Sequence, residues 1–289
     1  MSQRLLVVNA DDFGLTSGVD RAILRAGADG IVTSTSVLAT GPTLARSVSG
    51  LRASGLGIGA HLIAVGGASP LLPAREVPSL VDGQGRFPRS WHAFVGRSGR
   101  RGIDPDDLER EFAAQIESLI GTDLHLTHLD THQNIHLWPS VARVVVRLAR
   151  RYDIGFIRIP RTKARSPLGM GVRMLSGRLT RRIIAAALPT TGATIGLDEA
   201  GALHESALHD AIGRLGASGV DSADIVCHPG EAGDAVLEAT GWGFAWADEV
   251  AALTSPVTAE AVREAGFRLG TYAEVVPAES RVRPGNHNS

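Results

Sequence analysis

The strongest constraint on the fold is a short apolar run near the N-terminus that ends in acidic residues. Residues 5–8 read Leu-Leu-Val-Val, which is typical of a strand buried on both faces of a parallel sheet. Asp11 and Asp12 follow within the segment Asn-Ala-Asp-Asp-Phe-Gly of residues 9–14. Two neighbouring carboxylates are costly at the end of a buried strand, because each charge opposes ionisation of the other. The simplest explanation for this pair of carboxylates is that they bind a divalent cation. The alternative is an ordinary loop in which the acidic residues cap a helix.

The two carboxylates can face one site only under a geometric condition. Adjacent side chains of a regular strand point to opposite faces, so we expect the strand to have ended before Asp11 and Asp12. Gly14 favours a turn at this point, because glycine tolerates backbone angles that other residues avoid.

Strand-like and helix-like segments alternate along the rest of the chain. Predicted strands occupy residues 4–9, 31–39, 55–62, 124–130, 155–161, 193–197, 223–228 and 267–272. Predicted helices occupy residues 17–30, 43–53, 105–119, 139–151, 172–188, 205–215, 245–253 and 259–265. About seven or eight such units predict an α/β fold of the (β/α) barrel type, distorted or incomplete, with the active site at the C-terminal ends of the parallel strands.

The same pattern predicts the domain organisation. We expect one catalytic domain over residues 1–275, interrupted by inserted segments near residues 65–102 and 162–190. The first insertion is rich in Gly and Pro, and a loop of this length inside a domain is usually functional or mobile, so we expect it to cover the site. Residues 276–289 are expected to form a disordered tail.

Composition excludes several classes of protein. The 289 residues carry a formal net charge of −1, so no overall field favours nucleic acid as a partner. Cys227 is the only cysteine, which excludes an intrachain disulfide framework and suits a reducing compartment. No segment resembles a signal peptide or a membrane span. We therefore expect a cytoplasmic protein, in which Cys227 packs among apolar neighbours.

Histidines follow two further predicted strands. His61 ends the third strand, at the same relative position as Asp11 and Asp12 on the first. In residues 124–136 the strand period of two places His128, Asp130 and His132 on one face. A zinc-type site takes imidazoles and a carboxylate, with hydrogen-bond acceptors behind the imidazoles. The metal ligands expected from this chemistry are Asp12, His61 and His132, with His128 and Asp130 behind them or polarising a reacting group, and the alternative is a set of histidines that make ordinary hydrogen bonds.

His228 stands at another strand end, directly before a Pro-Gly turn. A histidine held in such a turn is suited to general acid or base catalysis. Arg158 or Arg161 ends the strand predicted at residues 155–161, where a cation could bind a hydroxyl-rich or anionic ligand. A salt bridge to the acidic residues is the alternative role for these arginines.

These motifs together resemble the YdjC-like carbohydrate deacetylase family, also called ChbG/HpnK. The matching segments are Asn-Ala-Asp-Asp-Phe-Gly at 9–14, Gly-Ala-His-Leu at 59–62, His-Leu-Asp-Thr-His at 128–132 and Cys-His-Pro-Gly at 227–230. They occur in order and span nearly the whole chain. The sequence departs from the family pattern at Asn134, where many members have another histidine.

The resemblance implies roles for individual residues. Asp11 would be the catalytic base and His228 the acid, while the metal ligands would be Asp12, His61 and His132. Residues expected to contact substrate or to support the ligands are His128, Asp130, Arg158, Arg161 and His136. The implied activity is metal-dependent removal of an N-acetyl group from an amino sugar.

The substrate and the metal remain open at this stage. Residues 242–246 and the insertion at 65–102 resemble the hopanoid-associated branch of the family. This resemblance implies that the substrate is an N-acetylglucosaminyl hopanoid glycolipid. Soluble chitooligosaccharides are the alternative substrate. Two imidazoles and a carboxylate suit zinc best, but also bind iron, Mg, Mn, Co or Ni. The rivals to a deacetylase are a non-haem iron enzyme and a catalytically silent sugar-binding protein.

The stretch between Ile154 and Leu197 contains no acidic residue. Its predicted helix at residues 172–188 combines four arginines with apolar side chains. This composition is typical of a helix that lies on an anionic membrane surface, and a surface helix packed on the barrel is the alternative. Peripheral contact with the inner face of the membrane is therefore a further expectation. A homodimer is a separate expectation.

Overall fold

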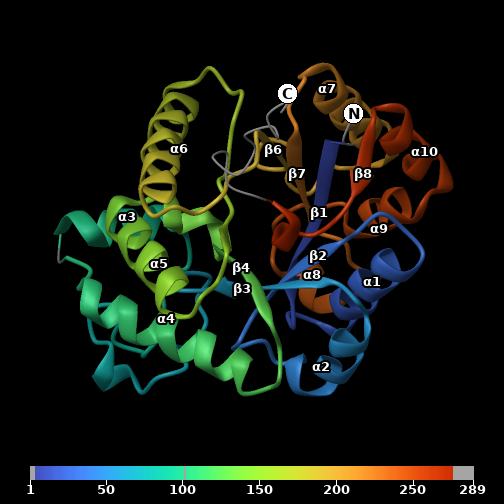
Figure 1. The fold of residues 1–289 in the computed structure, drawn as a ribbon. Coiled ribbons are helices and arrows are strands. Elements are labelled where there is room, and N and C mark those ends of the chain that lie inside the picture. The colour runs from blue at the N-terminus through green and yellow to red at the C-terminus, as the bar shows by residue number, and fades with distance from the viewer. Residues whose placement is uncertain (1–3, 101, 276–289) are drawn as a thin grey trace, which may run out of the picture.

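Parallel strands form one curled sheet that is open on one side, as in a distorted barrel (Figure 1). The computed structural model describes residues 4–100 and 102–275. The strands are β1 (Arg4–Phe13), β2 (Ser34–Val37), β3 (Gly57–Leu62), β4 (Leu126–Thr131), β5 (Phe156–Ile157), β6 (Ala193–Ile195), β7 (Ser222–Cys227) and β8 (Phe267–Leu269). They lie in the order β5-β4-β3-β2-β1-β7-β6, and β8 pairs with the N-terminal end of β1. The expected (β/α) barrel-like fold is confirmed.

Helices cover the outside of this sheet (Figure 1). They are α1 (Ser17–Ala28), α2 (Leu44–Ala53), α3 (Trp91–Arg100), α4 (Pro105–Ile120), α5 (Pro139–Arg151), α6 (Pro167–Ala185), α7 (Glu205–Ala217), α8 (Ala235–Ala239), α9 (Trp246–Thr254) and α10 (Pro256–Glu264). Short 3-10 turns form η1 (Ala74–Glu76), η2 (His132–Leu137) and η3 (Tyr272–Glu274). Local signals account for several of the boundaries: Asp104 caps α4 by accepting the Asp106 N–H, and proline stands at the first position of α4 and α5.

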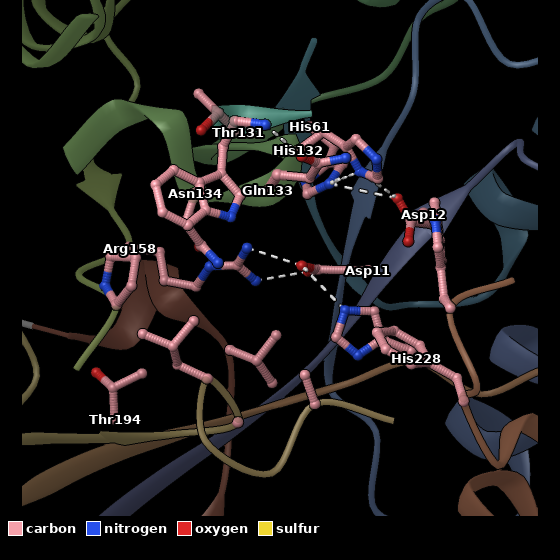
Figure 2. A pocket seen from close by; sticks show the side chains of 18 residues that line it. Asp11, Asp12, His61, Thr131, His132, Gln133, Asn134, Arg158, Thr194 and His228 are labelled. Carbon is pink, nitrogen blue, oxygen red and sulfur yellow. Dashed lines mark hydrogen bonds and ion pairs between the residues drawn. The ribbon is translucent and has the colours of Figure 1, made fainter. Parts of the chain in front are cut away.

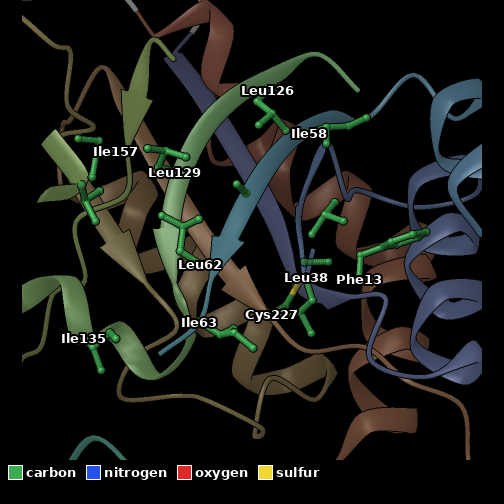
Figure 3. Close-up of a cluster of buried hydrophobic side chains, with 14 of the residues drawn as sticks. Phe13, Leu38, Ile58, Leu62, Ile63, Leu126, Leu129, Ile135, Ile157 and Cys227 are labelled. Atoms are coloured by element: carbon green, nitrogen blue, oxygen red, sulfur yellow. The ribbon is translucent and has the colours of Figure 1, made fainter. Parts of the chain in front are cut away.

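The large hydrophobic core lies between the sheet and the surrounding helices. Figure 3 shows part of it, with Leu62, Leu129 and Ile157 from three neighbouring strands. Cys227 is buried in the same core, as expected, and its thiol lies 3.4 Å from the carbonyl oxygen of Asn9.

A second, smaller apolar cluster fills the N-terminal end of the half-barrel. It contains Leu5, Val7, Phe156, Tyr272 and Val275. The Tyr272 ring stacks on Phe156, and its hydroxyl donates a hydrogen bond to the buried Asp224. By the period of two, the face that carries Leu5 and Val7 continues through Asn9 and Asp11. The interior of the half-barrel therefore changes from apolar to polar toward the C-terminal ends of its strands.

The end of β1 corrects one expectation. The strand does not end before the two carboxylates but runs on to Phe13, and its pairing with β2 is irregular between Ala10 and Phe13. Asp12 has a φ of 69°, a left-handed conformation that is uncommon outside glycine. This irregularity interrupts the alternation of side chains, so that a bulged strand replaces the predicted strand end. Gly14, with a φ of 98°, makes the predicted turn.

Other expectations also need correction. The strand predicted at residues 155–161 is only Phe156–Ile157, so both arginines lie in the segment after it. The insertion at 65–102 is not a structureless loop, because it contains η1 and α3. The helix predicted at 172–188 begins earlier and spans Pro167–Ala185. The tail predicted at residues 276–289 lies outside the described residues.

Within the described ranges, no helix combines the length and apolarity needed to cross a bilayer.

Candidate active site

Asp12, His61 and His132 form a close cluster at the C-terminal ends of β1, β3 and β4 (Figure 2). The Oδ1 atom of Asp12 lies 3.4 Å from His61 Nε2 and 3.2 Å from His132 Nδ1. The two imidazole nitrogens are 3.3 Å apart. Three possible ligand atoms from three strand ends therefore converge on one point.

The buried carboxylate of Asp130 orients the first of these imidazoles. Its Oδ1 atom lies 2.5 Å from His61 Nδ1. With the proton on Nδ1 donated to Asp130, Nε2 carries the lone pair and faces the cluster, which is the usual support of a metal-bound histidine. Burial lowers the pKa of His61, but the charges of Asp130 and Asp11 outweigh it and raise the pKa to about 10. The carboxylates around the cluster thus favour a positively charged group at this position.

The chemistry of the cluster fits a divalent metal ion. Asp12 Oδ1 is buried and has no hydrogen-bond partner among the described residues. Burial raises the pKa of Asp12, but the nearby imidazoles of His132 and then His61 hold it well below its usual range. One ionised oxygen and two imidazole nitrogens form a set typical of zinc and related metals. A second possible group, Asp11 with His61 and Asp130, fits less well because Arg158 already neutralises both of its carboxylates.

Arg158 joins the two remaining buried carboxylates of the site. Its guanidinium donates to Asp11 Oδ1 at 2.5 Å and to Asp11 Oδ2 at 2.7 Å, and lies 3.1 Å from Asp130 Oδ2. Such a bidentate contact fixes the orientation of a carboxylate. Burial raises the pKa of Asp130, but the charges of Arg158 and His61 outweigh this effect and lower it. Arg158 therefore forms salt bridges with acidic residues, which was the alternative role expected from the sequence.

His228 lies on the other side of Asp11 (Figure 2). Its Nε2 atom is 4.0 Å from Asp11 Oδ2. The main-chain N–H of His228 donates to the buried Glu249 at 2.6 Å, which fixes the backbone after β7. Asp11 and His228 therefore face a common space beside the metal-type cluster, at a distance that a water or a substrate atom can bridge.

A cleft of about 360 Å³ is lined by the metal-type cluster together with Asp11, Arg158 and His228. Part of its wall is aromatic and comes from Trp91, Trp242 and Phe244. The ring of Trp242 lies 5.5 Å from that of His132, and the ring of Phe244 lies 5.0 Å from that of His228. A cleft that combines charged groups with aromatic rings is suited to a small polar ligand with some apolar surface.

Four of the expected residues do not line this cleft. One is Asp130, which is fully buried and contacts His61. His128 is buried behind it, and desolvation lowers its pKa to about 4. Arg161 donates to the main-chain oxygen of Thr191. His136 is also fully buried and lies 3.0 Å from the main-chain oxygen of Arg158. His136 therefore contacts the backbone of Arg158 and does not face the cleft.

His136 carries a prediction about stability. Its Nε2–H donates to the Arg158 carbonyl and its Nδ1 accepts from the Thr131 hydroxyl, so both nitrogens are satisfied in the neutral form. Burial, and then the charge of Arg158, lower its pKa from 6.5 to about 4. Between these values the unfolded state binds a proton that the folded state does not, so stability falls as the pH drops from about 6.5 toward 4.

In the metal-free protein, His136 should lower the free energy of unfolding by about 2 kcal/mol between pH 7 and pH 5. Urea unfolding at the two pH values measures the loss, which His136→Gln should reduce and the exposed control His125→Gln should not. Equal losses in wild type and His136→Gln would remove this histidine as a cause of acid sensitivity.

Comparison with known proteins identifies the family. The model of the family described as YdjC-like protein matches residues 5–264. The chain belongs to the YdjC-like family. The resemblance drawn from the four sequence motifs is thereby confirmed, and the match includes each of the strand ends that build the cleft.

Two relatives and one solved structure of similar length extend this finding. A carbohydrate deacetylase of Geobacillus stearothermophilus is 32% identical over 272 residues, which cover 94% of this chain and 98% of the relative. A chitooligosaccharide deacetylase of Escherichia fergusonii is 28% identical over 94% of this chain and the whole of its own. A crystal structure from Enterococcus faecalis, described provisionally as a cellobiose-phosphate cleavage protein, is 28% identical with a TM-score of 0.77 and covers 94% of this chain and 98% of its own.

Several supporting residues of this YdjC-like site were missed by sequence reasoning. The Asn9 amide donates to Asp11 Oδ1 at 2.8 Å and to the Ser36 hydroxyl at 2.9 Å, and Ser36 donates to Asp130 Oδ2 at 2.6 Å. The polar run Ser-Thr-Ser at residues 34–36, inside a buried strand, was an available signal. Glu249 carried no such signal, because it lies on an ordinary helix far along the chain.

Proposed function

We propose that this protein is a metal-dependent carbohydrate deacetylase, which hydrolyses the N-acetyl group of an amino sugar. One observation carries the proposal: Asp12, His61 and His132 converge beside an Asp11–His228 pair in a single cleft. The activity printed for the full-length relatives supports it. The intact pair argues against a silent sugar-binding protein, since binding alone needs no proton-transfer groups beside a metal site.

The residues have separate roles in this proposal. Asp12, His61 and His132 would hold the ion, zinc most readily by ligand type. When bound, such an ion polarises a carbonyl and lowers the pKa of a coordinated water. Asp11 accepts the proton of the attacking water, and the guanidinium of Arg158 holds its carboxylate in place. His228 donates a proton to the sugar nitrogen, which is a poor leaving group without it.

The test is release of acetate by the purified protein. Metal-free protein, reconstituted separately with zinc, manganese, cobalt, nickel or magnesium, is assayed on N-acetylated glycans and glycolipids without oxygen. Acetate release with at least one metal is the expected result. Product that forms only with iron and oxygen would instead support the oxygenase alternative, and binding without product would support a sugar-binding protein.

Two substrates remain within the proposal. Chitooligosaccharides are the substrate named for the Escherichia fergusonii relative. An N-acetylglucosaminyl hopanoid glycolipid is the second, and the surface of α6 favours it. Met170 and Met174 are both more than half exposed on this helix. Residues 155–196 include its arginines and contain no acidic residue that would balance their charge.

A surface of this kind also supports peripheral contact with an anionic membrane. Each basic residue near such a surface contributes about 1 kcal/mol, weakened by salt. Flotation with anionic liposomes should show salt-sensitive binding that is lost when Arg178, Arg181 and Arg182 are changed to Glu. No binding at low salt would restrict the proposal to soluble sugars in the cytoplasm.

A further inference from the structure

A second cavity adjoins the catalytic cleft, and we propose that it binds an apolar group attached to the substrate sugar. It has a volume of about 500 Å³ and lies between η2, α3 and the N-terminal half of α6. We call it the apolar chamber. The inference rests on the proposed deacetylase function and names the substrate class: amino sugars linked to a hydrophobic aglycone.

The chamber and the cleft adjoin each other. Trp91, Gln133, Asn134 and Leu197 line both of them. Gln133 and Asn134 have φ values of 52° and 54°, a conformation that non-glycine residues adopt rarely and only when their surroundings enforce it. The side chain of Gln133 accepts the main-chain N–H of Trp91 at 2.8 Å, which ties α3 to this shared wall. The two spaces therefore share part of one wall, which places the chamber directly beside a sugar bound in the cleft.

The walls of the chamber select against a second sugar. Its apolar lining comes from Phe94, Val95, Ile135, Leu137, Trp138, Leu168, Val172 and Leu175. Most of its polar side chains are already engaged within the protein. Ser166 caps α6, and Asp198 accepts hydrogen bonds from the Thr162 hydroxyl and the Lys163 N–H. Few groups remain for the hydroxyls of a sugar, so an apolar occupant fits better.

The position of the opening supports the same occupant. Leu168 lines the chamber and is 57% exposed. It therefore places an apolar side chain where the chamber meets solvent. The N-terminal half of α6, at the edge of the molecule in Figure 1, thus borders the opening of a chamber that adjoins the catalytic cleft.

A pair of synthetic substrates tests the chamber. The methyl and hexyl β-glycosides of N-acetylglucosamine share the reacting group and differ only in apolar length. The hexyl glycoside should show a kcat/KM about tenfold higher or more, because its added methylenes leave water. N,N′-diacetylchitobiose, which places a second sugar in the same direction, should not show this gain.

Variants on one helix locate the effect. Leu175→Gln and Leu168→Gln should lower the hexyl-to-methyl ratio toward one, and Leu168 is exposed enough that its replacement leaves the fold intact. Ile184→Gln, on an exposed part of α6 outside the chamber, should keep the wild-type ratio. Equal kcat/KM values for the two glycosides, or a chitobiose gain lost in the chamber variants, would overturn the proposal.

A binding measurement separates this inference from the proposed function. Calorimetry with metal-free protein should give a Kd for the hexyl glycoside about tenfold lower or more than for the methyl glycoside, with the difference lost in Leu168→Gln. If no acetate is released but this difference is found, the deacetylase proposal fails and the chamber stands. If acetate is released but the Kd values are equal, the chamber proposal fails alone.

Discussion

Replacement of Asp11 by Asn is expected to lower acetate release by about 10²- to 10⁴-fold while leaving metal binding intact. The amide keeps the shape of the carboxylate and can still contact Asn9 and Arg158, but it cannot take a proton from the attacking water. Asp11 is not part of the Asp12–His61–His132 cluster, so the metal content of the purified variant should match that of the wild type. Kinetics with metal analysis on the same sample make the measurement.

A folding control is needed for this variant, because Arg158 is buried and loses one of its two charged partners. Asp123→Asn is the matched control: Asp123 is an exposed carboxylate with a φ of 58°, a conformation that Asn tolerates. It should retain activity within about twofold, as is usual for surface changes. An Asp11→Asn protein that is folded, loaded with metal and nearly as active as wild type would show that another group is the base.

The second large effect is expected for His132→Ala, which should lose the metal and, with it, the activity. Three ligand atoms converge on the site, and this change removes one of them while leaving Asp12 Oδ1 and His61 Nε2 in place. We expect metal affinity to fall by at least about 100-fold, since ligand removal should cost no less than loss of a supporting residue. Elemental analysis after dialysis against limiting zinc measures this directly.

His125→Ala provides the control for that experiment, because it removes an exposed histidine just before β4. Its zinc content should equal that of the wild type. Removal of zinc from the wild type with a chelator should abolish activity reversibly. Full zinc occupancy in His132→Ala would show that His132 is not a metal ligand. The metal site proposed for the three converging side chains would then be wrong.

The two variants also differ in what excess metal can do. High zinc should restore part of the activity of His132→Ala, because Asp12 and His61 still offer two ligands. It should not rescue Asp11→Asn, where the missing group is a proton acceptor. This contrast distinguishes a ligand from a base even if both variants show low activity in the first assay.

The sequence by itself determined the features that depend on neighbouring residues. The cap at Asp104 and the proline after it determine where α4 begins, and the apolar run at residues 5–8 determines a buried strand. Because parallel strands that alternate with helices bring their C-terminal ends to one edge, the positions of Asp12, His61 and His132 at strand ends were enough to predict one shared site.

Only the tertiary structure decided how the charges of that site are arranged. The sequence could not show that Asp12 turns inward through a left-handed residue in a continuing strand, since the alternation of side chains would have placed it outside. Nor could it show that Arg158 pairs with both Asp11 and Asp130. These contacts join residues far apart in the chain, and which charges meet depends on how the sheet curls.

The apolar chamber illustrates the same limit. Its walls come from α3, η2 and α6, and of these only part of α6 was predicted as a helix from the sequence. Whether a helix face packs against a neighbour or borders a cavity depends on the spacing of helices, which no local pattern encodes. The sequence therefore predicted which groups gather at the shared site, and the packing of distant elements decided which groups neutralise one another and where cavities lie beside them.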